Sequence, residues 1–233
     1  MRAAVSTVDD ALPISPLEER ESVERRVAAV LRELIVSGQL REGTPLVHRE
    51  LAAKLGVSPT PVRAGLGQLE RDGLVVFAPN GRASVSRLTR EDFEEIYAAR
   101  LGTEGLAARL GAPAVSDAAL AAMREMLERL RVHAARQELD EYLGLRWEFH
   151  ATCYRSSGRT RLVDEVERLY RRSERYNRLV LASPERFRES VARYGEFLAA
   201  CEARDGDAAE RIIHTAMRWA VDRLAPTLPS ERD

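Results

Sequence analysis

The stretch VHRELAAKLGVSPTPVRAGLGQLERDGL, from Val47 to Leu74, decides the fold of the first third of the chain. A short helical pattern runs roughly from Val47 to Leu55 and ends at Gly56, and a second pattern carries Val62, Leu66 and Leu69. Between them, Ser58 can cap the second helix and Pro59 fits its first turn. The sequence therefore predicts two short helices joined by a tight turn.

Helical spacing also precedes this stretch, and strand-like residues follow it. Apolar residues recur at three and four positions from Val23 to Ile35, which predicts a helix capped by Ser22. Gly43 and Pro45 mark a turn after it. The β-type runs 74–77 and 83–86 flank Pro79-Asn80-Gly81-Arg82, a hairpin signal. This order predicts a winged helix-turn-helix DNA-binding domain over residues 21–88.

Such a domain places the start of its third helix in the major groove, where side chains meet base edges and phosphates. Arg49 begins the preceding helix and is placed to pair a phosphate. At the wing tip, Gly81 allows close approach of the backbone and Arg82 adds positive charge. The residues that we expect to contact DNA are Arg49, Ser58, Thr60, Arg63, Gly81 and Arg82.

From Thr89 to about Ala225 the pattern is helical throughout, without a strand signal. We expect about six helices over residues 89–226, so the fold class is mainly α. Residues 1–20 are expected to be a flexible arm and residues 227–233 a frayed tail. Breaks are expected near 111–113, 136–138, 156–158, 183–184 and 205–206, and the candidate caps are Thr89, Ser116, Thr160, Ser183 and Asp207.

Composition and charge point to a polyanion-binding module joined to a neutral one. The 233 residues are 45% hydrophobic, enough for a core, and their net charge is −1. Residues 22–90 hold eleven basic and six acidic side chains, a balance of +5. The absence of a long apolar run or a secretory core predicts a cytoplasmic protein without membrane contact. Cys153 and Cys201 are too isolated for a disulfide framework or a cysteine zinc finger.

The sequence resembles the GntR family of bacterial transcription regulators. The motif from Arg49 to Arg63 and the segment 69–75 carry the match to the DNA-binding domain. The helical remainder resembles the FCD-type sensor domain of the FadR-like branch, through segments 96–100 and 104–108, Phe149-His150 and 206–208. The resemblance covers about residues 22–225. It implies a homodimer that binds a palindromic DNA operator and responds to a small-molecule effector.

Two departures from the family pattern fall in the predicted third helix. Pro59 stands where the family usually has arginine, so one base contact is missing. Ala64-Gly65 replaces the usual Glu-Ala, and Gly65 and Gly67 each cost roughly 1 kcal/mol against alanine inside a helix. The resemblance therefore implies an altered operator, or a larger share of the readout for Arg49 and Arg63.

The family resemblance also implies a metal site that this sequence does not keep. Many relatives hold a divalent metal with one aspartate and three histidines. Here Arg146, Tyr194 and Arg218 align with three of those positions, and His150 alone remains. Arginine offers no lone pair to a metal. We expect no metal or other cofactor, with His150 and His214 as the fallback ligands if the register of the last helix differs.

Two arginines at ligand positions predict a site for an organic anion, such as a carboxylate or acyl compound. The residues expected to converge there are Arg100, Arg146, His150, Tyr194, His214 and Arg218. The alternative is that Arg146 and Arg218 lie on outer faces or pair with Glu148 and Asp222. Arg100 can equally bridge to Glu104 at a spacing of four.

Other functions fit the sequence less well. The four histidines form no HExxH motif, GxSxG and P-loop motifs are missing, and His150 with Cys153 is a single pair of the kind common in cores. We therefore do not expect an enzyme. A helical scaffold without DNA binding would leave the predicted wing and the positive segment unexplained. The sequence thus predicts an effector-controlled DNA-binding regulator, with a metal-dependent sensor of the same family as the alternative.

Overall fold

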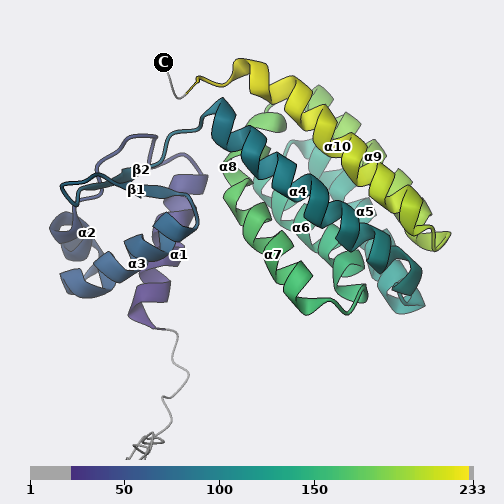
Figure 1. The fold of residues 1–233 in the computed structure, drawn as a ribbon, viewed down its shortest axis with the longest axis horizontal. Coiled ribbons are helices and arrows are strands. Elements are labelled where there is room, and N and C mark those ends of the chain that lie inside the picture. The colour runs from purple at the N-terminus through teal and green to yellow at the C-terminus, as the bar shows by residue number, and fades with distance from the viewer. Residues whose placement is uncertain (1–21, 231–233) are drawn as a thin grey trace, which may run out of the picture.

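The computed structural model of the chain describes residues 22–230, in which a small N-terminal domain precedes a larger helical bundle (Figure 1). Each part has its own hydrophobic core. The expected arm, residues 1–20, and the last three residues of the expected tail lie outside the described range. Within residues 22–230, no helix is long and apolar enough to cross a membrane.

The N-terminal domain is a helix-turn-helix with a two-stranded antiparallel wing, as predicted. Ser22 caps the first helix through a bond from the Arg25 backbone N–H. The wing pairs Val75 with Val85 and Phe77 with Ala83. The elements are α1 (Val23–Val36), α2 (His48–Leu55), α3 (Pro59–Arg71), β1 (Val75–Phe77) and β2 (Ala83–Val85).

The segment before α2 extends the wing, which the sequence did not reveal. We expected a plain turn at Gly43 and Pro45. Instead, the Leu46 N–H donates to the Ala83 carbonyl (2.9 Å) and Pro45 forms an antiparallel bridge with Ser84. The open edge of β2 is thereby paired, which reduces the number of unsatisfied backbone groups in a two-stranded sheet.

Gly65 explains one departure from the family pattern. A Cβ at this position would lie 3.1 Å from both the Glu24 carbonyl oxygen and Val27 Cγ1, so the glycine lets α3 approach α1 closely. Gly67 faces open space, and its nearest neighbour is the far end of Arg71 at 4.0 Å. The two glycines therefore have different consequences, although both weaken the helix locally.

The C-terminal part is a bundle in which α4 packs against α10, α6 and α7, while α5 packs against α6 and α9. Thr89, Ser116 and Ser183 cap α4, α5 and α9 as expected. The helices are α4 (Arg90–Gly111), α5 (Asp117–Arg136), α6 (Leu139–Ser156), α7 (Thr160–Arg172), α8 (Glu174–Val180), α9 (Pro184–Glu202) and α10 (Gly206–Leu224), with 3₁₀ turns η1 (Ala112–Ala114) and η2 (Ala225–Thr227).

Three details of the bundle differ from the sequence-based predictions. The described range contains seven α-helices after residue 89 because the chain breaks at Ser173, where neither glycine nor proline marks the end of a helix. Arg159 rather than Thr160 precedes α7, and Asp205 rather than Asp207 caps α10 by accepting from the Ala208 N–H (2.8 Å).

The expected tail begins as an ordered part of the bundle. Leu228 is buried, and the Pro229 carbonyl accepts from the Arg90 N–H at 2.9 Å. The expectation of a frayed tail from residue 227 is therefore wrong for residues 227–230. These residues close the end of α4 that adjoins the DNA-binding domain.

Gly65→Ala and Gly67→Ala form a matched pair that tests the α1–α3 contact. Gly67→Ala should raise the free energy of unfolding by roughly 1 kcal/mol, because alanine is the better helix former and nothing obstructs it. Gly65→Ala should lower it by about 1–3 kcal/mol, because the methyl group separates α3 from α1. Urea unfolding of both variants measures the difference. A gain in stability for both would contradict the close packing.

Candidate DNA interface and effector cavity

The N-terminal end of α3 presents the side chains that we expected to meet DNA. Ser58, Thr60 and Arg63 are all exposed. The Ser58 side chain makes no capping hydrogen bond to its helix, so its hydroxyl is available to an external acceptor or donor. Val62, Leu66 and Leu69, on the opposite side of α3, are buried in the domain core. The core therefore holds α3 with its polar face outward.

Positive charge surrounds this face without internal neutralisation. Arg49 on α2, Arg63 on α3 and Arg82 beside the wing tip are exposed. Among the described residues, no carboxylate lies within ion-pair distance of these three guanidinium groups. Gly81, at the tip, has a φ of 76°, a conformation that favours glycine. Free arginines on three successive elements suit a polyanion.

Pro59 and Pro61 change how α3 can hold a phosphate. The first backbone N–H groups of a helix have no partner inside it and commonly bind anions. Two prolines in the first turn remove two of those donors and leave the N–H groups of Thr60 and Val62. Arginine side chains must therefore supply more of the phosphate contacts than in a helix that begins without proline.

A small cavity of about 50 Å³ lies inside the bundle between α6, α8, α9 and α10. It has room for a few water molecules. Three residues that we predicted for the effector site line it, namely Arg146, His150 and Tyr194. The other lining residues are Val180, Leu181, Ser190, Arg193, Ile212, Ile213, Ala216, Trp219 and Ala220.

Arg146 brings a positive charge to this cavity without an acidic partner. No carboxylate of residues 22–230 lies within ion-pair distance of it, and its buried Nε has no hydrogen-bond partner. The expected alternative partner, Glu148, pairs with Arg155 instead (2.8 Å). The Arg146 guanidinium lies 5.7 Å from the centre of the Tyr170 ring. A largely desolvated cation with aromatic rings as neighbours is costly until an anion pairs with it.

His150 lines the same cavity as a neutral ring. Burial, and then the charges of Arg146 and Arg100, lower the pKa of His150 well below its usual range. Its buried Nδ1 has no hydrogen-bond partner, while its ring lies 4.9 Å from those of Tyr194 and Phe197. Burial raises the pKa of Tyr194, although Arg146 opposes that shift. Beside Arg146, the site therefore holds polar groups that stay neutral.

Three of the six predicted effector residues do not line this cavity, and two of these three, His214 and Arg218, lie on α10. Arg218 is exposed on α10, so the expectation that it converges with Arg146 is wrong. His214 also lies outside the lining. Its Nε2 is 3.1 Å from the Leu101 carbonyl, in the contact between α10 and α4. The ungapped count placed Arg218 on the wrong side of α10, and His214 does not reach the cavity either, because Ile212, Ile213 and Ala216 are among the residues that line it from that helix.

Arg193, which the sequence analysis missed, is the second arginine at the cavity. Its guanidinium carbon lies 4.5 Å from the centre of the Trp219 ring, and its Nη1 donates to the Glu189 carbonyl (3.0 Å). Because Arg193 is adjacent to Tyr194 in the sequence, it could have been considered as a second residue of the predicted site. Two arginines thus approach the cavity, from α6 and α9.

Arg100 is a structural residue of the bundle, which was one of the two predicted roles. Its Nε donates to Glu104 Oε1 at 2.6 Å, and its Nη1 donates to Ser173 Oγ at 3.0 Å. Glu104 also accepts from the Tyr154 hydroxyl (3.0 Å). Burial alone would lower the pKa of Arg100, but Glu104 and Tyr97 raise it, and the net shift is upward. This buried network joins α4 to the break between α7 and α8.

The same break contacts the DNA-binding domain. Arg175 Nη1 donates to the Ser86 carbonyl (2.9 Å), and Glu174 accepts from Arg32 of α1 (2.7 Å). Arg32 also bonds Asp72 at the end of α3 (2.8 Å). The first residues of α8 therefore hold both α1 and the segment that follows β2.

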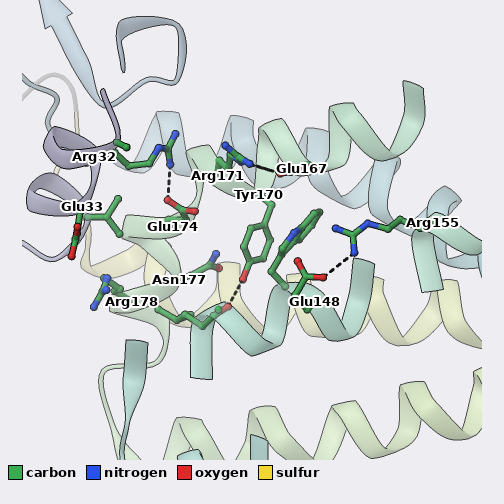
Figure 2. Close-up of a pocket in the computed structure, with 15 residues that line it drawn as sticks. Arg32, Glu33, Glu148, Arg155, Glu167, Tyr170, Arg171, Glu174, Asn177 and Arg178 are labelled. Carbon is green, nitrogen blue, oxygen red and sulfur yellow. Dashed lines mark hydrogen bonds and ion pairs between the residues drawn. The ribbon is translucent and has the colours of Figure 1, made fainter. Parts of the chain in front are cut away.

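A cleft of about 490 Å³ lies between the two domains, bounded by α1 and by α6, α7 and α8 (Figure 2). Trp147 and Tyr170 provide aromatic surface there, with ring centres 4.7 Å apart. Figure 2 shows Arg32 directed at Glu174 across the cleft. Tyr170 thus lines the interdomain cleft while its ring centre also lies 5.7 Å from the Arg146 guanidinium.

Comparison with known proteins identifies both domains. Residues 23–85 match the family described as bacterial regulatory proteins, gntR family, and residues 95–218 match the FCD domain. The chain belongs to the GntR family. It is a transcriptional regulator with a helix-turn-helix and an FCD domain, and the similar proteins are regulators rather than enzymes.

Two relatives of this GntR regulator illustrate the similarity, one of them also through its solved structure. A transcriptional regulator in an unstable DNA locus of Streptomyces ambofaciens is 32% identical over 205 residues, covering 86% of this chain and 84% of that protein. The regulator McbR of Escherichia coli K12 is 26% identical over 199 residues, covering 84% and 90%. The solved structure of E. coli McbR/YncC shares the fold, with a TM-score of 0.76, 24% identity and coverage of 89% and 99%.

Two chemical alternatives find little support among the described residues. Nowhere between residues 22 and 230 do three or more His, Cys, Asp or Glu side chains gather as a metal site, so the fallback pair His150 and His214 has no third ligand of these types. Cys153 is fully buried beside Cys201, with the sulfur atoms 3.7 Å apart. The hydrogen bond to Cys201 and burial raise the pKa of Cys153, which makes its thiol a poor nucleophile.

The buried His150 should make the GntR regulator less stable in mild acid. Below about pH 6.5 the unfolded chain takes up a proton at this histidine before the folded chain does, because the folded pKa is lowered. The free energy of unfolding should then fall by up to about 1.4 kcal/mol per pH unit. His150→Phe removes this contribution. Urea unfolding from pH 5 to 8 should show wild type losing stability relative to the variant below pH 6.5, and a constant difference above pH 7. A constant difference at all pH values would contradict the neutral, buried histidine.

Proposed function

We propose that this regulator binds a palindromic operator as a homodimer in the cytoplasm, and that a small organic anion bound at Arg146 changes its affinity for that operator. The observation that carries the effector part is the Arg146 guanidinium, which borders an internal cavity with no carboxylate partner among the described residues. The free arginines around α3 support the DNA part. One winged helix buries too little surface for tight specific binding, which supports two copies.

The cavity suits the head group of an effector better than a whole metabolite. Its volume of about 50 Å³ is far below the several hundred Å³ of usual ligand pockets. A carboxylate can pair with Arg146 and accept from the Tyr194 hydroxyl, while Arg193 lies at the same cavity. The body of the effector would require apolar side chains of α8, α9 or α10 to move. A short carboxylate or an acyl compound is therefore the proposed class.

A path from this site to DNA runs through Tyr170 and α8. An anion that pairs with Arg146 draws the guanidinium away from the ring of Tyr170, a residue that lines the interdomain cleft. Tyr170 also accepts a bond from Ser173 Oγ at its carbonyl (2.7 Å), at the break between α7 and α8. Because Glu174 and Arg175 hold the DNA-binding domain, a shift of this break alters the placement of α3, and operator affinity follows by linkage.

Alanine substitutions at Arg49 and Arg63 test the docking on DNA. Each should weaken binding to a selected genomic fragment by about 1–3 kcal/mol if the side chain contacts a base. A contact to phosphate alone should weaken binding to all sequences alike and lower the salt slope by about one. Fluorescence anisotropy at several salt concentrations separates these outcomes.

Arg71→Ala is the matched control for this measurement. Arg71 is equally exposed but lies in the last turn of α3, so its loss removes the same charge away from the proposed contact. It should affect specific binding much less than Arg63→Ala. Equal effects of all three substitutions would show that only overall charge matters, and unchanged affinity for Arg49→Ala and Arg63→Ala would exclude the docking.

Arg146→Met tests the effector site. Removing an unpaired, largely desolvated cation should leave the melting temperature unchanged or raise it, and should abolish the response to carboxylates. A thermal-shift screen of short mono- and dicarboxylates and acyl thioesters, followed by operator binding with the best compound, measures both. Arg218→Met, on the exposed side of α10, should respond like wild type.

Metal analysis of the protein purified without chelator completes this test. Stoichiometric zinc, nickel or manganese would favour the metal-dependent sensor over the anion site. A normal response of Arg146→Met would show that the effector binds elsewhere in the molecule, and the 490 Å³ interdomain cleft would be the next location to test.

A further inference from the structure

The cavity beside Arg146 comes close to the molecular surface between α9 and α10, which pack side by side (Figure 1). Its lining residues from α8 are buried, whereas Ser190, Arg193 and Trp219 from α9 and α10 are only half-buried. The helix that supplies Arg146, α6, packs against α4, α5 and α7 inside the bundle. The contact between α9 and α10 is therefore the candidate entrance from solvent.

Trp219 contacts two guanidinium groups at this entrance. The centre of its ring lies 4.5 Å from the guanidinium carbon of Arg193 and 4.7 Å from that of Arg223. Its indole N–H donates to Glu189 Oε2 at 2.6 Å, and the same oxygen lies 3.3 Å from Arg223 Nη2. Two of these side chains come from α9 and two from α10, at a spacing of four residues on each helix. The four side chains thus tie α9 to α10 around one aromatic ring.

Only part of this cluster belongs to the cavity. Trp219 and Arg193 line it, whereas Glu189 and Arg223 do not. Arg223 is exposed, so it holds the ring from the solvent side. Trp219 itself is half-buried at the edge of the hydrophobic core, and displacing its ring costs less than displacing a fully buried side chain. The ring therefore covers the entrance and is held there mainly by polar and cation–π contacts.

Arg193 links this cluster to the proposed anion site. No carboxylate of residues 22–230 lies within ion-pair distance of its guanidinium, and the nearby Glu189 carboxylate pairs with Arg223 instead. Arg193 and Arg146 line the same cavity. An anion held by Arg146 therefore also attracts Arg193 and weakens the contact of Arg193 with the Trp219 ring.

We propose that Trp219 is the gate of the effector cavity, and that an effector enters between α9 and α10 when the ring swings away. The inference rests on the proposed effector site at Arg146 and adds how that site is reached. The closed cavity of about 50 Å³ holds a head group only, so the rest of a longer effector takes the space that the ring leaves. The tryptophan ring therefore limits which acyl compounds the regulator accepts.

A cysteine placed in the cavity measures the gate with a chemical probe instead of the effector. Ala220 is buried and lines the cavity one residue after Trp219, and the native Cys153 and Cys201 are buried outside the lining. The full chain carrying Ala220→Cys is treated with iodoacetamide, a small neutral reagent whose iodide is displaced by the thiolate sulfur. Peptide mass spectrometry follows the rate of labelling at each thiol.

Substitutions that release the ring should speed this labelling. Adding Trp219→Ala should raise the rate at least about tenfold, because two cation–π contacts and a hydrogen bond no longer hold a ring at the entrance. Adding Arg223→Met should raise it about threefold, since Arg223 holds the ring without lining the cavity. Arg218→Met is the matched control, because Arg218 is an exposed arginine beside Trp219 on α10, and it should leave the rate unchanged. Equal rates in all four proteins would overturn the gate.

The native thiols distinguish an open gate from a loosened bundle. Cys153 and Cys201 lie in the core, so they react only when the bundle itself opens. In the Trp219→Ala protein they should stay unlabelled while the cysteine at position 220 reacts. If all three thiols react together in both the Trp219→Ala and the Arg223→Met proteins, the ring only holds the bundle together and the gate is wrong.

Iodoacetate separates the gate from the proposed anion site, because this reagent is itself a short carboxylate. Dividing its rate by that of iodoacetamide cancels the effects of gate opening and of thiol ionisation. The ratio should exceed that of a free thiol such as N-acetylcysteinamide, and Arg146→Met should lower it severalfold. A ratio that Arg146→Met leaves unchanged would overturn the anion site while the gate stands. A normal ratio with labelling that Trp219→Ala and Arg223→Met do not accelerate would overturn the gate alone.

Discussion

The arrangement of the two domains depends on how the bundle neutralises one buried charge. Arg100 is almost fully inaccessible to solvent, and an isolated charge there would cost several kcal/mol. Glu104 supplies the countercharge one turn along α4, and Ser173 accepts a further bond from the guanidinium. That bond fixes the break between α7 and α8, and the residues just after the break hold the DNA-binding domain. The position of α3 is thus tied to an ion pair in the interior of the sensor domain.

Two arginines of the same bundle, Arg100 and Arg146, differ in whether a carboxylate lies beside them, and this difference marks Arg146 as the candidate anion site. Arg100 has a glutamate four residues later, and Arg146 has His150 at that spacing. The carboxylate satisfies the first arginine permanently. The histidine stays neutral beside the second because burial, and then the charge of Arg146, lower its pKa. Of these two arginines, one therefore has its anionic partner within the bundle and the other lacks one among the described residues. Both guanidinium groups face the Tyr170 ring, at 5.3 Å and 5.7 Å, so the completed and the incomplete site share a neighbour.

Local sequence signals predicted the DNA-binding domain well because its elements are short and clearly punctuated. Gly56 and the hairpin residues act within a few positions, and the structure follows them. Ser58 stands at the predicted cap position of α3, but its side chain makes no capping hydrogen bond. The sensor site depends on helix rotation over long distances, which local signals do not determine. Arg146, His150 and Tyr194 do line one cavity, but counting along α10 without a gap put Arg218 inward, and Arg193 was overlooked. The break at Ser173 was missed because tertiary hydrogen bonds, rather than glycine or proline, produce it.

The two sides of α3 are constrained differently, because one side packs closely against α1 at Gly65 and the other faces outward. One side of α3 is fixed by packing, since Val62, Leu66 and Leu69 are buried and Gly65 leaves no space for a side chain. The other side, with Thr60, Arg63 and Ala64, touches nothing that the fold requires. Mutations on this outer side alter which bases are read at little cost in stability, whereas mutations on the inner side must preserve volume. A regulator built in this way can acquire a new operator by drift on one surface while its link to the effector domain remains unchanged.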